Sequence, residues 1–184
     1  MKKTLCLIFT GIALVYGFQA ALAEQAPQSV IDLGNSTLSA FGTDPVLVKA
    51  VQSENARKKT LDQIKALDQQ WINTPGIADF MKAVLDNETA QYLDAIQKKE
   101  PYFAEIFLMD NQGALVAATD KTSDYWQGDE DKFSQPFTTG TMLVSEVEFD
   151  TSAQAYLVQI SVPVKDGDKI IGAITFGINL DEFE

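Results

Sequence analysis

The chain has 184 residues and carries 26 acidic against 14 basic side chains, a formal net charge of −12 at pH 7. This acidity argues against nucleic acid or an anionic lipid surface as a partner. With no histidine and only one cysteine, Cys6, the chain lacks Ser-His and Cys-His nucleophiles and the two commonest kinds of zinc ligand.

The first 23 residues have the composition of a secretory signal peptide. Lys2 and Lys3 precede an apolar run from Leu5 to Phe18, and Ala21-Leu22-Ala23 supplies a small-residue cleavage site. An uncleaved anchor helix is the alternative, since the apolar stretch is almost long enough to span a bilayer. We favour cleavage. The mature protein then lacks cysteine and disulfides, which fits a bacterial periplasm, and we expect no membrane insertion of the mature chain.

Helical signals follow a short polar tail, Glu24 to Pro27. A first helix is predicted over Ser29–Phe41 and is broken by Gly42 to Pro45. Asp44 before Pro45 is a suitable cap and first-turn pair for the next helix.

Apolar residues at helical spacing continue to Trp71 and indicate one long helix or two consecutive ones. Thr74-Pro75 restarts the pattern, and a second apolar stripe stops before Pro101. The stripes consist of Leu47, Val51, Leu61, Ile64, Leu67 and Trp71, then of Ile77, Phe80, Met81, Val84, Leu85, Tyr92, Ala95 and Ile96. We expect both stripes to face the core and assign them no chemistry.

The second half changes to the alternating period of strands. The predicted strands cover residues 102–109, 114–118, 141–149, 156–164 and 170–178, with turn chemistry at 110–113 and 165–168. Residues 103–180 are therefore predicted to be a block of five short strands without helices, apart from a short helix that Asp131 to Gln135 suggests.

Helices followed by hairpins predict an α+β domain, in which N-terminal long helices pack on one face of a central antiparallel sheet of about five strands. We expect residues 24–44 to form a tail and first helix, and residues 45–184 to form one domain. The long connection from 119 to 140 would fold over the opposite sheet face and leave a concave pocket there.

The connection between the second and third predicted strands is the best candidate for a functional site. It is long, acidic and aromatic, and an ordered loop of this kind inside a compact sheet is more often functional than idle. Aromatic rings can wall a pocket and carboxylates can fix a cationic group, an ammonium over a ring gaining about 0.5–2 kcal/mol. The candidate ligand-binding residues are Tyr125, Trp126, Asp124, Asp129, Phe133 and Phe107.

Structural roles compete with this interpretation. Tyr125 could equally be a pin that fastens the loop to the domain, and for Trp126 the pin is favoured. Asp129 and Glu130 could cap the short helix that follows. The acidic residues of the loop lack the glycine spacing of a calcium loop, and no carboxylate pair lies in a recognisable motif. We therefore expect no metal, no cofactor and no catalytic residues.

Three runs resemble the Cache superfamily, the PAS-like extracytoplasmic sensor domains. The first hairpin of that fold is similar to FAEIFLMDNQGALVAAT at residues 103–119, and the loop of its single-domain branch is similar to TSDYWQGDE at residues 122–130. Its closing hairpin is similar to ISVPV at 160–164 with IIGAI at 170–174. The loop departs from the family in having Lys132-Phe133 where a tryptophan pair is common, and in having no arginine.

The resemblance implies a long helix against an antiparallel sheet, with amino acids, organic acids or amines bound between sheet and loops. It suggests a periplasmic small-molecule sensing module. We expect neither a membrane helix nor a signalling domain to follow the fifth strand, and therefore expect occupancy to be reported to a membrane-bound signalling partner. The alternatives are a ligand-independent periplasmic interaction or assembly protein with the same fold, and an acid-pair hydrolase.

Overall fold

The structure is a computed structural model that describes residues 24–150 and 154–183. Its helices are α1 (Gln28–Ser36), the 3₁₀ helix η1 (Leu38–Thr43), α2 (Pro45–Asn55), α3 (Leu61–Ile72), the 3₁₀ helix η2 (Asp79–Met81), α4 (Lys82–Leu85), α5 (Glu88–Gln97), α6 (Asp131–Thr139) and α7 (Leu180–Phe183). Its strands are β1 (Phe103–Met109), β2 (Leu115–Ala118), β3 (Leu143–Val144), β4 (Glu148–Asp150), β5 (Ala155–Asp166) and β6 (Lys169–Asn179). The predicted signal peptide, residues 1–23, lies outside the described residues. In the described part of the chain, no helix has the length and hydropathy of a membrane-spanning segment.

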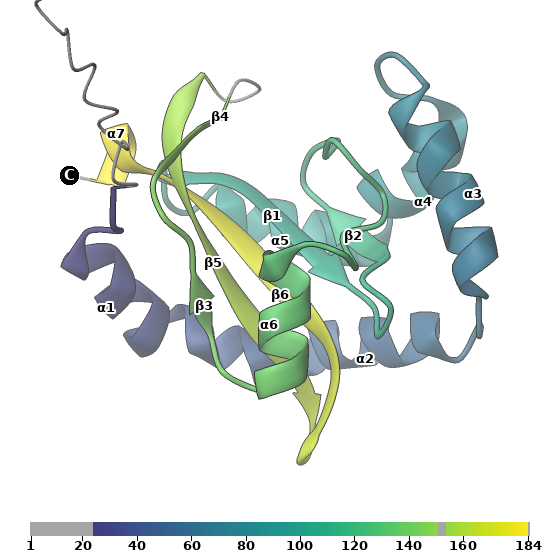
Figure 1. Cartoon of the computed structure of the whole chain (residues 1–184), viewed down its shortest axis with the longest axis horizontal. Helices are drawn as coiled ribbons and strands as arrows, with labels where there is room; N and C mark the ends of the chain where they lie inside the picture. The colour runs from purple at the N-terminus through teal and green to yellow at the C-terminus, as the bar shows by residue number, and fades with distance from the viewer. Residues whose placement is uncertain (1–23, 151–153, 184) are drawn as a thin grey trace, which may run out of the picture.

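The strands form one antiparallel sheet in the order β2-β1-β6-β5-β3, with β4 also paired to β5 (Figure 1). The two long strands β5 and β6 make the centre, and β1 joins them from the other side of β6. The predicted α+β class, with N-terminal helices packed on a central antiparallel sheet, is confirmed.

Two details of the predicted strand block were wrong. The third strand, expected over 141–149, is split into β3 and β4, because the pairing with β5 shifts by one residue after Ser145 and Val147 N–H donates instead to the Glu24 carbonyl at 2.8 Å. The block also contains a full helix, α6, which runs to Thr139 rather than Gln135 and ends where Gly140 adopts a left-handed φ of 71°. Both details depend on tertiary contacts and not on local sequence pattern, so the strand and helix periods did not predict them.

The helical half follows its local caps. The Asp44 carboxylate accepts from Val46 N–H at 2.8 Å, as expected for the cap of α2. Thr60 and Gln63 form a capping box that starts α3. Between the two helices Lys58 has a φ of 52°. The stretch up to Trp71 is therefore two consecutive helices rather than one.

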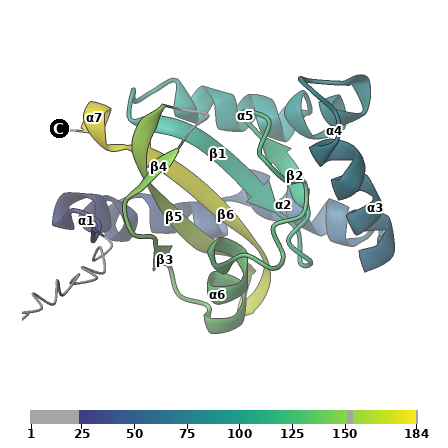
Figure 2. The ribbon, with the colours of Figure 1, turned by 45° about the horizontal axis from the view of Figure 1, so that its top comes forward.

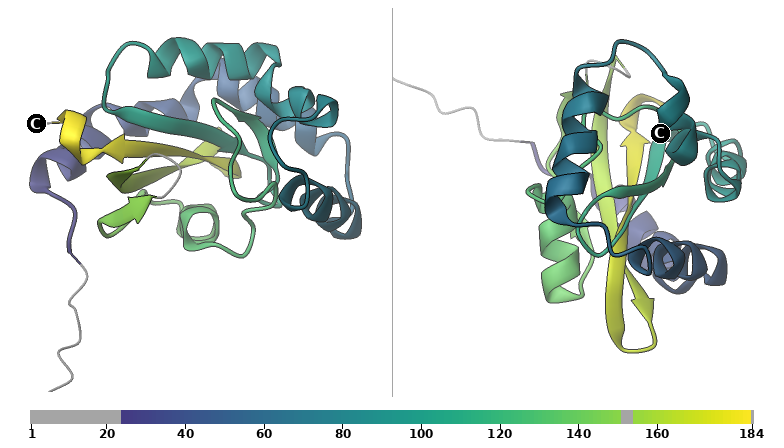
Figure 3. Two further views of the ribbon diagram at one scale, coloured as in Figure 1. Left: turned by 90° about the horizontal axis from the view of Figure 1, so that it is seen from above. Right: turned by 90° about the vertical axis from the view of Figure 1, so that its right-hand side faces the viewer.

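One face of the sheet, which we call the helix-covered face, is packed by α1, η1, α2 and α5 (Figure 3). Alternate residues of β1, β5 and β6 point to this side and meet the predicted apolar stripes. The shared core includes Val30, Leu38, Leu47, Val51, Leu93, Ile96, Ile106, Leu108, Val158, Ile160, Val162, Ile174, Phe176 and Ile178. The face is apolar throughout and supplies the main core of the domain.

The opposite face, which we call the cavity face, is covered by α6 and by the loop after β2 (Figure 2). A second, smaller core lies at its β2 end, where α3 and α4 pack. Away from that end the face carries polar groups, including the buried Ser161 and Thr175, whose hydroxyl oxygens lie 2.9 Å apart. The two faces of the sheet thus differ in the polarity of their side chains as well as in the elements that pack on them.

Candidate functional site

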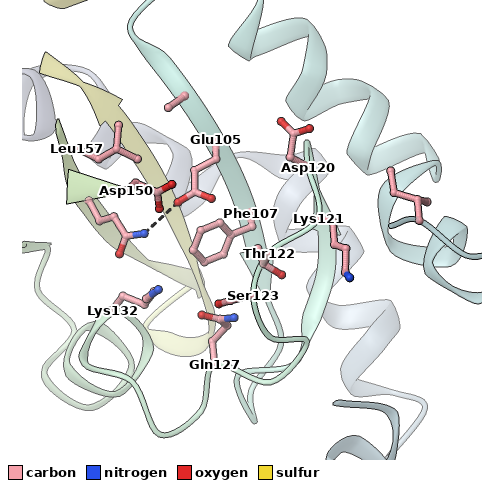
Figure 4. A pocket seen from close by; sticks show the side chains of 13 residues that line it. Glu105, Phe107, Asp120, Lys121, Thr122, Ser123, Gln127, Lys132, Asp150 and Leu157 are labelled. Atoms are coloured by element: carbon pink, nitrogen blue, oxygen red, sulfur yellow. Dashed lines mark hydrogen bonds between the residues drawn. The ribbon is translucent and has the colours of Figure 1, made fainter. Parts of the chain in front are cut away.

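A cavity of about 480 Å³ lies on the cavity face, between the sheet, the loop after β2 and α6 (Figure 4). Strands supply its floor and the loop supplies the wall opposite β5. It is lined by Ile77, Ala104, Glu105, Phe107, Asp120, Lys121, Thr122, Ser123, Gln127, Lys132, Asp150, Leu157 and Gln159. The sequence predicts a pocket at this place, between the sheet and the loop.

A glycine in β6 makes the polar part of the floor possible. Glu105 of β1 and Gln159 of β5 both pair with Gly177 of β6, one from each side. A Cβ at Gly177 would lie 2.6 Å from Glu105 Cγ, so a larger residue would displace that side chain. Across the glycine, Gln159 Nε2 donates to Glu105 Oε1 at 3.0 Å (Figure 4).

Phe107 and Lys132 come from different elements and meet within the cavity. The Phe107 ring lies two residues beyond Glu105 on the same side of β1. Lys132, in the first turn of α6, places Nζ 5.6 Å from the centre of that ring. The same ammonium lies 2.9 Å from Glu130 Oε2. The lysine charge is therefore already paired within the protein.

Gln127 closes the cavity from the loop side, and its side chain is only 1% exposed. Its Nε2 donates to the Asp124 carbonyl at 2.8 Å, while its Oε1 is buried with no hydrogen-bond partner among residues 24–150 and 154–183. Because a carbonyl oxygen only accepts, this bond fixes which end of the amide faces which way. Buried polar atoms normally have partners, so an orphaned acceptor at a cavity wall indicates a missing donor.

The loop is held in place by contacts on its outer side, away from the cavity. Asp68 Oδ1, on α3, accepts from the backbone N–H groups of Tyr125 at 2.9 Å and Trp126 at 3.0 Å. Trp71 Nε1 donates to the Thr122 carbonyl at 2.9 Å, and Lys59 Nζ to the Tyr125 hydroxyl at 3.1 Å. The cavity wall is thus braced by α3 and by the connection that precedes it.

The loop also pairs with the β1–β2 hairpin. Leu115 N–H donates to the Tyr125 carbonyl, and Gln127 N–H donates to the Gly113 carbonyl at 2.8 Å. Gly113 has a φ of 82°, and a Cβ there would lie 2.5 Å from the Cα of Gly128. The tight turn therefore needs glycine, and it sets how closely the loop approaches the sheet.

The charges around the cavity are mixed, with Glu105, Asp120 and Asp150 against Lys121 and Lys132. Burial raises the pKa of the Glu105 carboxyl above its ordinary value, while the Gln159 hydrogen bond and the charge of Lys132 act in the opposite direction. Within the described residues, no group of three or more histidine, cysteine or acidic side chains is placed to hold a metal ion.

Comparison with protein families matches residues 77–184 to the family described as methyl-accepting chemotaxis protein-like, first PDC sensor domain. That range is more than half of the chain and includes every strand and the whole cavity. The chain belongs to this family. The predicted resemblance to Cache sensor domains is therefore confirmed, with the matched part of this PDC sensor domain beginning after α3.

Solved structures of sensor domains resemble the chain more distantly. They include the sensor domain of the V. cholerae histidine kinase DctB (16% identity, 84% of this chain and 55% of that one, TM-score 0.41). A second is the sensory domain of the Campylobacter jejuni chemoreceptor Tlp3 (20% identity, 84% of this chain and 65% of that one, TM-score 0.43). A third is the ligand-binding domain of the Pseudomonas aeruginosa PAO1 amino acid chemoreceptor PctC, in complex with GABA (12% identity, 84% of this chain and 61% of that one, TM-score 0.43). The chain spans between 55% and 65% of the length of these three domains. Comparison with curated protein sequences gives no match.

The six residues predicted for ligand binding lie in three places in this PDC domain. Phe107 lines the cavity. Tyr125 and Phe133 are buried in the smaller core, where the Tyr125 ring lies 5.9 Å from that of Trp71. The position of Tyr125 is that of the structural pin considered from the sequence.

Asp124, Trp126 and Asp129 lie on the outer side of the loop, along a more open hollow of about 540 Å³ against α3. Trp126 is fastened there by a hydrogen bond from its Nε1 to the Gln112 carbonyl at 2.7 Å and by Lys65, whose Nζ is 4.6 Å from its ring. The role of these residues in binding stays a prediction.

Sequence reasoning missed the polar residues of the cavity, among them Glu105, Gln127, Lys132 and Gln159. One signal was present: Glu105 is the only charged residue in an otherwise apolar strand, which marks a carboxylate turned to one face of the sheet. Gln159 breaks the apolar run of β5 in the same way. For Gln127 and Lys132 the sequence carries no comparable signal, because their orientation depends on the fold of the loop and of α6.

Proposed function

We propose that this protein is a periplasmic small-molecule sensing module, which binds one solute in the cavity between sheet and loop. Membership of a chemotaxis-type sensor family supports a sensing role. The single observation that carries the ligand claim is the cavity of about 480 Å³, with the unpartnered Gln127 oxygen buried in its wall. Amino acids, amines and organic acids all have the size for this volume.

Export through the leader at residues 1–23, with cleavage after Ala23, would deliver the domain to the periplasm. There a membrane-bound signalling protein is the proposed partner, by analogy with the methyl-accepting chemotaxis proteins that the family description names. A ligand shifts such a pairing only if the partner distinguishes the occupied state from the empty one. The braces from Asp68 and Trp71 to the loop offer a route, since they connect the cavity wall to α3 in the helical half.

A thermal-shift screen against a broad set of small metabolites tests the proposal. A ligand at 100 times its dissociation constant should add about 2.7 kcal/mol to the free energy of unfolding. The substitution Gln159→Phe, which fills the cavity, should remove the shift. Gln91→Phe makes the same change on the exposed surface of α5, behind the helix-covered face, and should leave the shift intact. If no metabolite stabilises the wild-type domain, the sensing proposal fails.

The ligand-independent interaction protein keeps one observation in its favour. Phe149 and Tyr156 form an edge-to-face aromatic pair, with ring centres 5.2 Å apart, and are 51% and 53% exposed. Replacing both residues with serine should abolish co-purification with a membrane partner if this pair is the docking surface. That alternative also predicts a cavity filled by side chains, so the open cavity favours the sensing module.

A further inference from the structure

Several hydrogen-bond donors around the cavity already have partners within the protein. The Thr122 hydroxyl donates to the Asp124 carbonyl at 2.6 Å, and the Ser123 hydroxyl lies 2.7 Å from Asp124 Oδ2. Lys121 Nζ donates to the Thr74 carbonyl at 2.7 Å. Each hydroxyl has one proton, so these two groups can offer a ligand only their acceptor oxygens.

The deeper groups follow the same pattern. Gln159 Nε2 donates to Glu105, Gln127 Nε2 donates to a backbone carbonyl, and Lys132 is paired with Glu130. Two acceptors of the lining stand out: the Gln127 Oε1, which is buried without a partner among the described residues, and the Glu105 carboxylate, which accepts from Gln159. Both groups accept hydrogen bonds.

We propose that the ligand of this cavity carries a cationic amino group, which donates to the Glu105 carboxylate and to Gln127 Oε1. This inference rests on the proposed function and narrows its ligand class to amines and amino-bearing solutes. An ammonium supplies both the donor that Gln127 lacks and a counter-charge for Glu105. The aliphatic part of the ligand would pack against Phe107 and Leu157, which are both buried in the cavity floor.

An organic acid fits the same surroundings poorly. A carboxylate has no proton to give to Gln127 Oε1, and it would have to compete with Glu130 for Lys132 and with the Thr74 carbonyl for Lys121. It would also lie among Glu105, Asp120 and Asp150. Like charges in a partly desolvated site repel strongly, so exclusion of diacids is part of the proposal.

A matched series of four-carbon probes tests it by calorimetric titration: 1,4-diaminobutane, 4-aminobutanoate, succinate and 1,4-butanediol. These differ in charge and in donors but little in length. Binding is expected for the two amino compounds, and none for succinate or for the neutral diol. Binding of succinate with no binding of the amines overturns the amine assignment while leaving the sensing function standing. Failure of all four probes, together with failure of every amine in the broad metabolite screen, overturns the amine assignment, and the sensing function falls with it only if no metabolite of any class stabilises the domain.

Substitutions locate the bound group. Glu105→Gln keeps the shape and the contact with Gln159 but removes the charge, and should weaken amine binding on the order of 30-fold. Glu182→Gln makes the same change on the exposed α7 and should leave binding unchanged. Removal of a buried charge does not threaten folding, so loss of binding in the Glu105 variant is interpretable. Unchanged amine affinity in Glu105→Gln would move the amine to another site and overturn the proposal.

Discussion

The two faces of the sheet have different roles, although the same strands form both. On the helix-covered face, β1, β5 and β6 present only apolar side chains, and α1, α2 and α5 close over them. On the cavity face the same strands present Glu105, Gln159, Ser161 and Thr175, and the cover is one helix and a loop. Stability is concentrated on the first face and chemistry on the second.

This division has a physical reason. A sheet face packed by amphipathic helices leaves no room for an uncompensated polar group, because burial of such a group costs free energy. A loop held by a few hydrogen bonds at its outer side leaves space beneath it, and polar groups can remain there. The bracing contacts to α3 therefore connect the helical half to the loop that covers the cavity.

The largest expected effect breaks the helix-covered face. Phe176 of β6 is fully buried, with its ring 5.2 Å from Phe41 and 5.9 Å from Phe103. Phe176→Ala should lower the free energy of unfolding by about 3–5 kcal/mol through lost burial and a new cavity. Urea unfolding followed by circular dichroism measures it. A loss below about 1 kcal/mol would contradict the assignment of the main core to this face.

A smaller effect should follow from removing the brace between the two halves. Asp68→Ala leaves the N–H groups of Tyr125 and Trp126 without their acceptor, at an expected cost of about 2–3 kcal/mol. It should also weaken ligand binding, because the cavity wall is no longer fixed. Asp68→Asn retains an acceptor oxygen and should keep most of both properties. Equal losses in the two variants would point to the charge, and not to the hydrogen bonds, as the stabilising feature.

A substitution of the glycine in the cavity floor should affect ligand binding more than stability. In Gly177→Ala the new methyl group meets Glu105 Cγ, so the carboxylate must turn away from Gln159. We expect a stability loss of about 1 kcal/mol, near the lower end for overpacking, because the atom displaced belongs to a flexible side chain. Ligand affinity should fall by a larger factor. Unfolding and calorimetry on the same sample test this, and unchanged affinity would show that the position of Glu105 is not critical.

The subtlest difference between the faces is a dependence on pH. Burial raises the pKa of Glu105 in the folded protein, so its ionisation is harder there than in the unfolded chain. The contribution of Glu105 to the free energy of unfolding is thus fully present below the ordinary glutamate pKa. It is lost as the pH rises through the raised pKa of the folded protein. Each pKa unit of difference between the folded and unfolded states corresponds to about 1.4 kcal/mol in the free energy of unfolding. Amine binding should show the opposite trend, because it needs the ionised carboxylate.

Unfolding curves and amine titrations across this pH window, on wild-type protein and on Glu105→Gln, measure both trends. Asp110 also has its pKa raised by burial, so only the difference between the two proteins belongs to Glu105. Two proteins with parallel stability profiles would indicate that Glu105 is hydrated in the folded state.

Much of the architecture could be predicted from the sequence because it depends on local pattern. The stripe from Leu47 to Trp71 indicated helices, and the Asp44-Pro45 pair indicated where one begins. Alternation in β5 and the turn between β1 and β2 indicated hairpins. Even the place of the cavity followed, since helices on one face leave the long loop for the other.

The residues of the site could not be predicted in the same way. Tyr125 and Trp126 are the most conspicuous side chains of the loop, yet they pack on its outer side, while Gln127 beside them lines the cavity. The choice is made by Asp68 and Lys59, which are distant in sequence and hold the loop in one orientation. A loop has no period, so its sequence does not encode which side faces the sheet.

The sequence by itself therefore determined most of the elements, their order and the face that would be open, because hydrophobic periodicity and capping act within a few residues. The tertiary structure decided which groups meet in the cavity. Glu105, Gln159 and Gly177 come together only when β6 is inserted between β1 and β5. The unpaired state of Gln127 Oε1 likewise exists only in the folded protein, where the loop, the sheet and α6 exclude other donors.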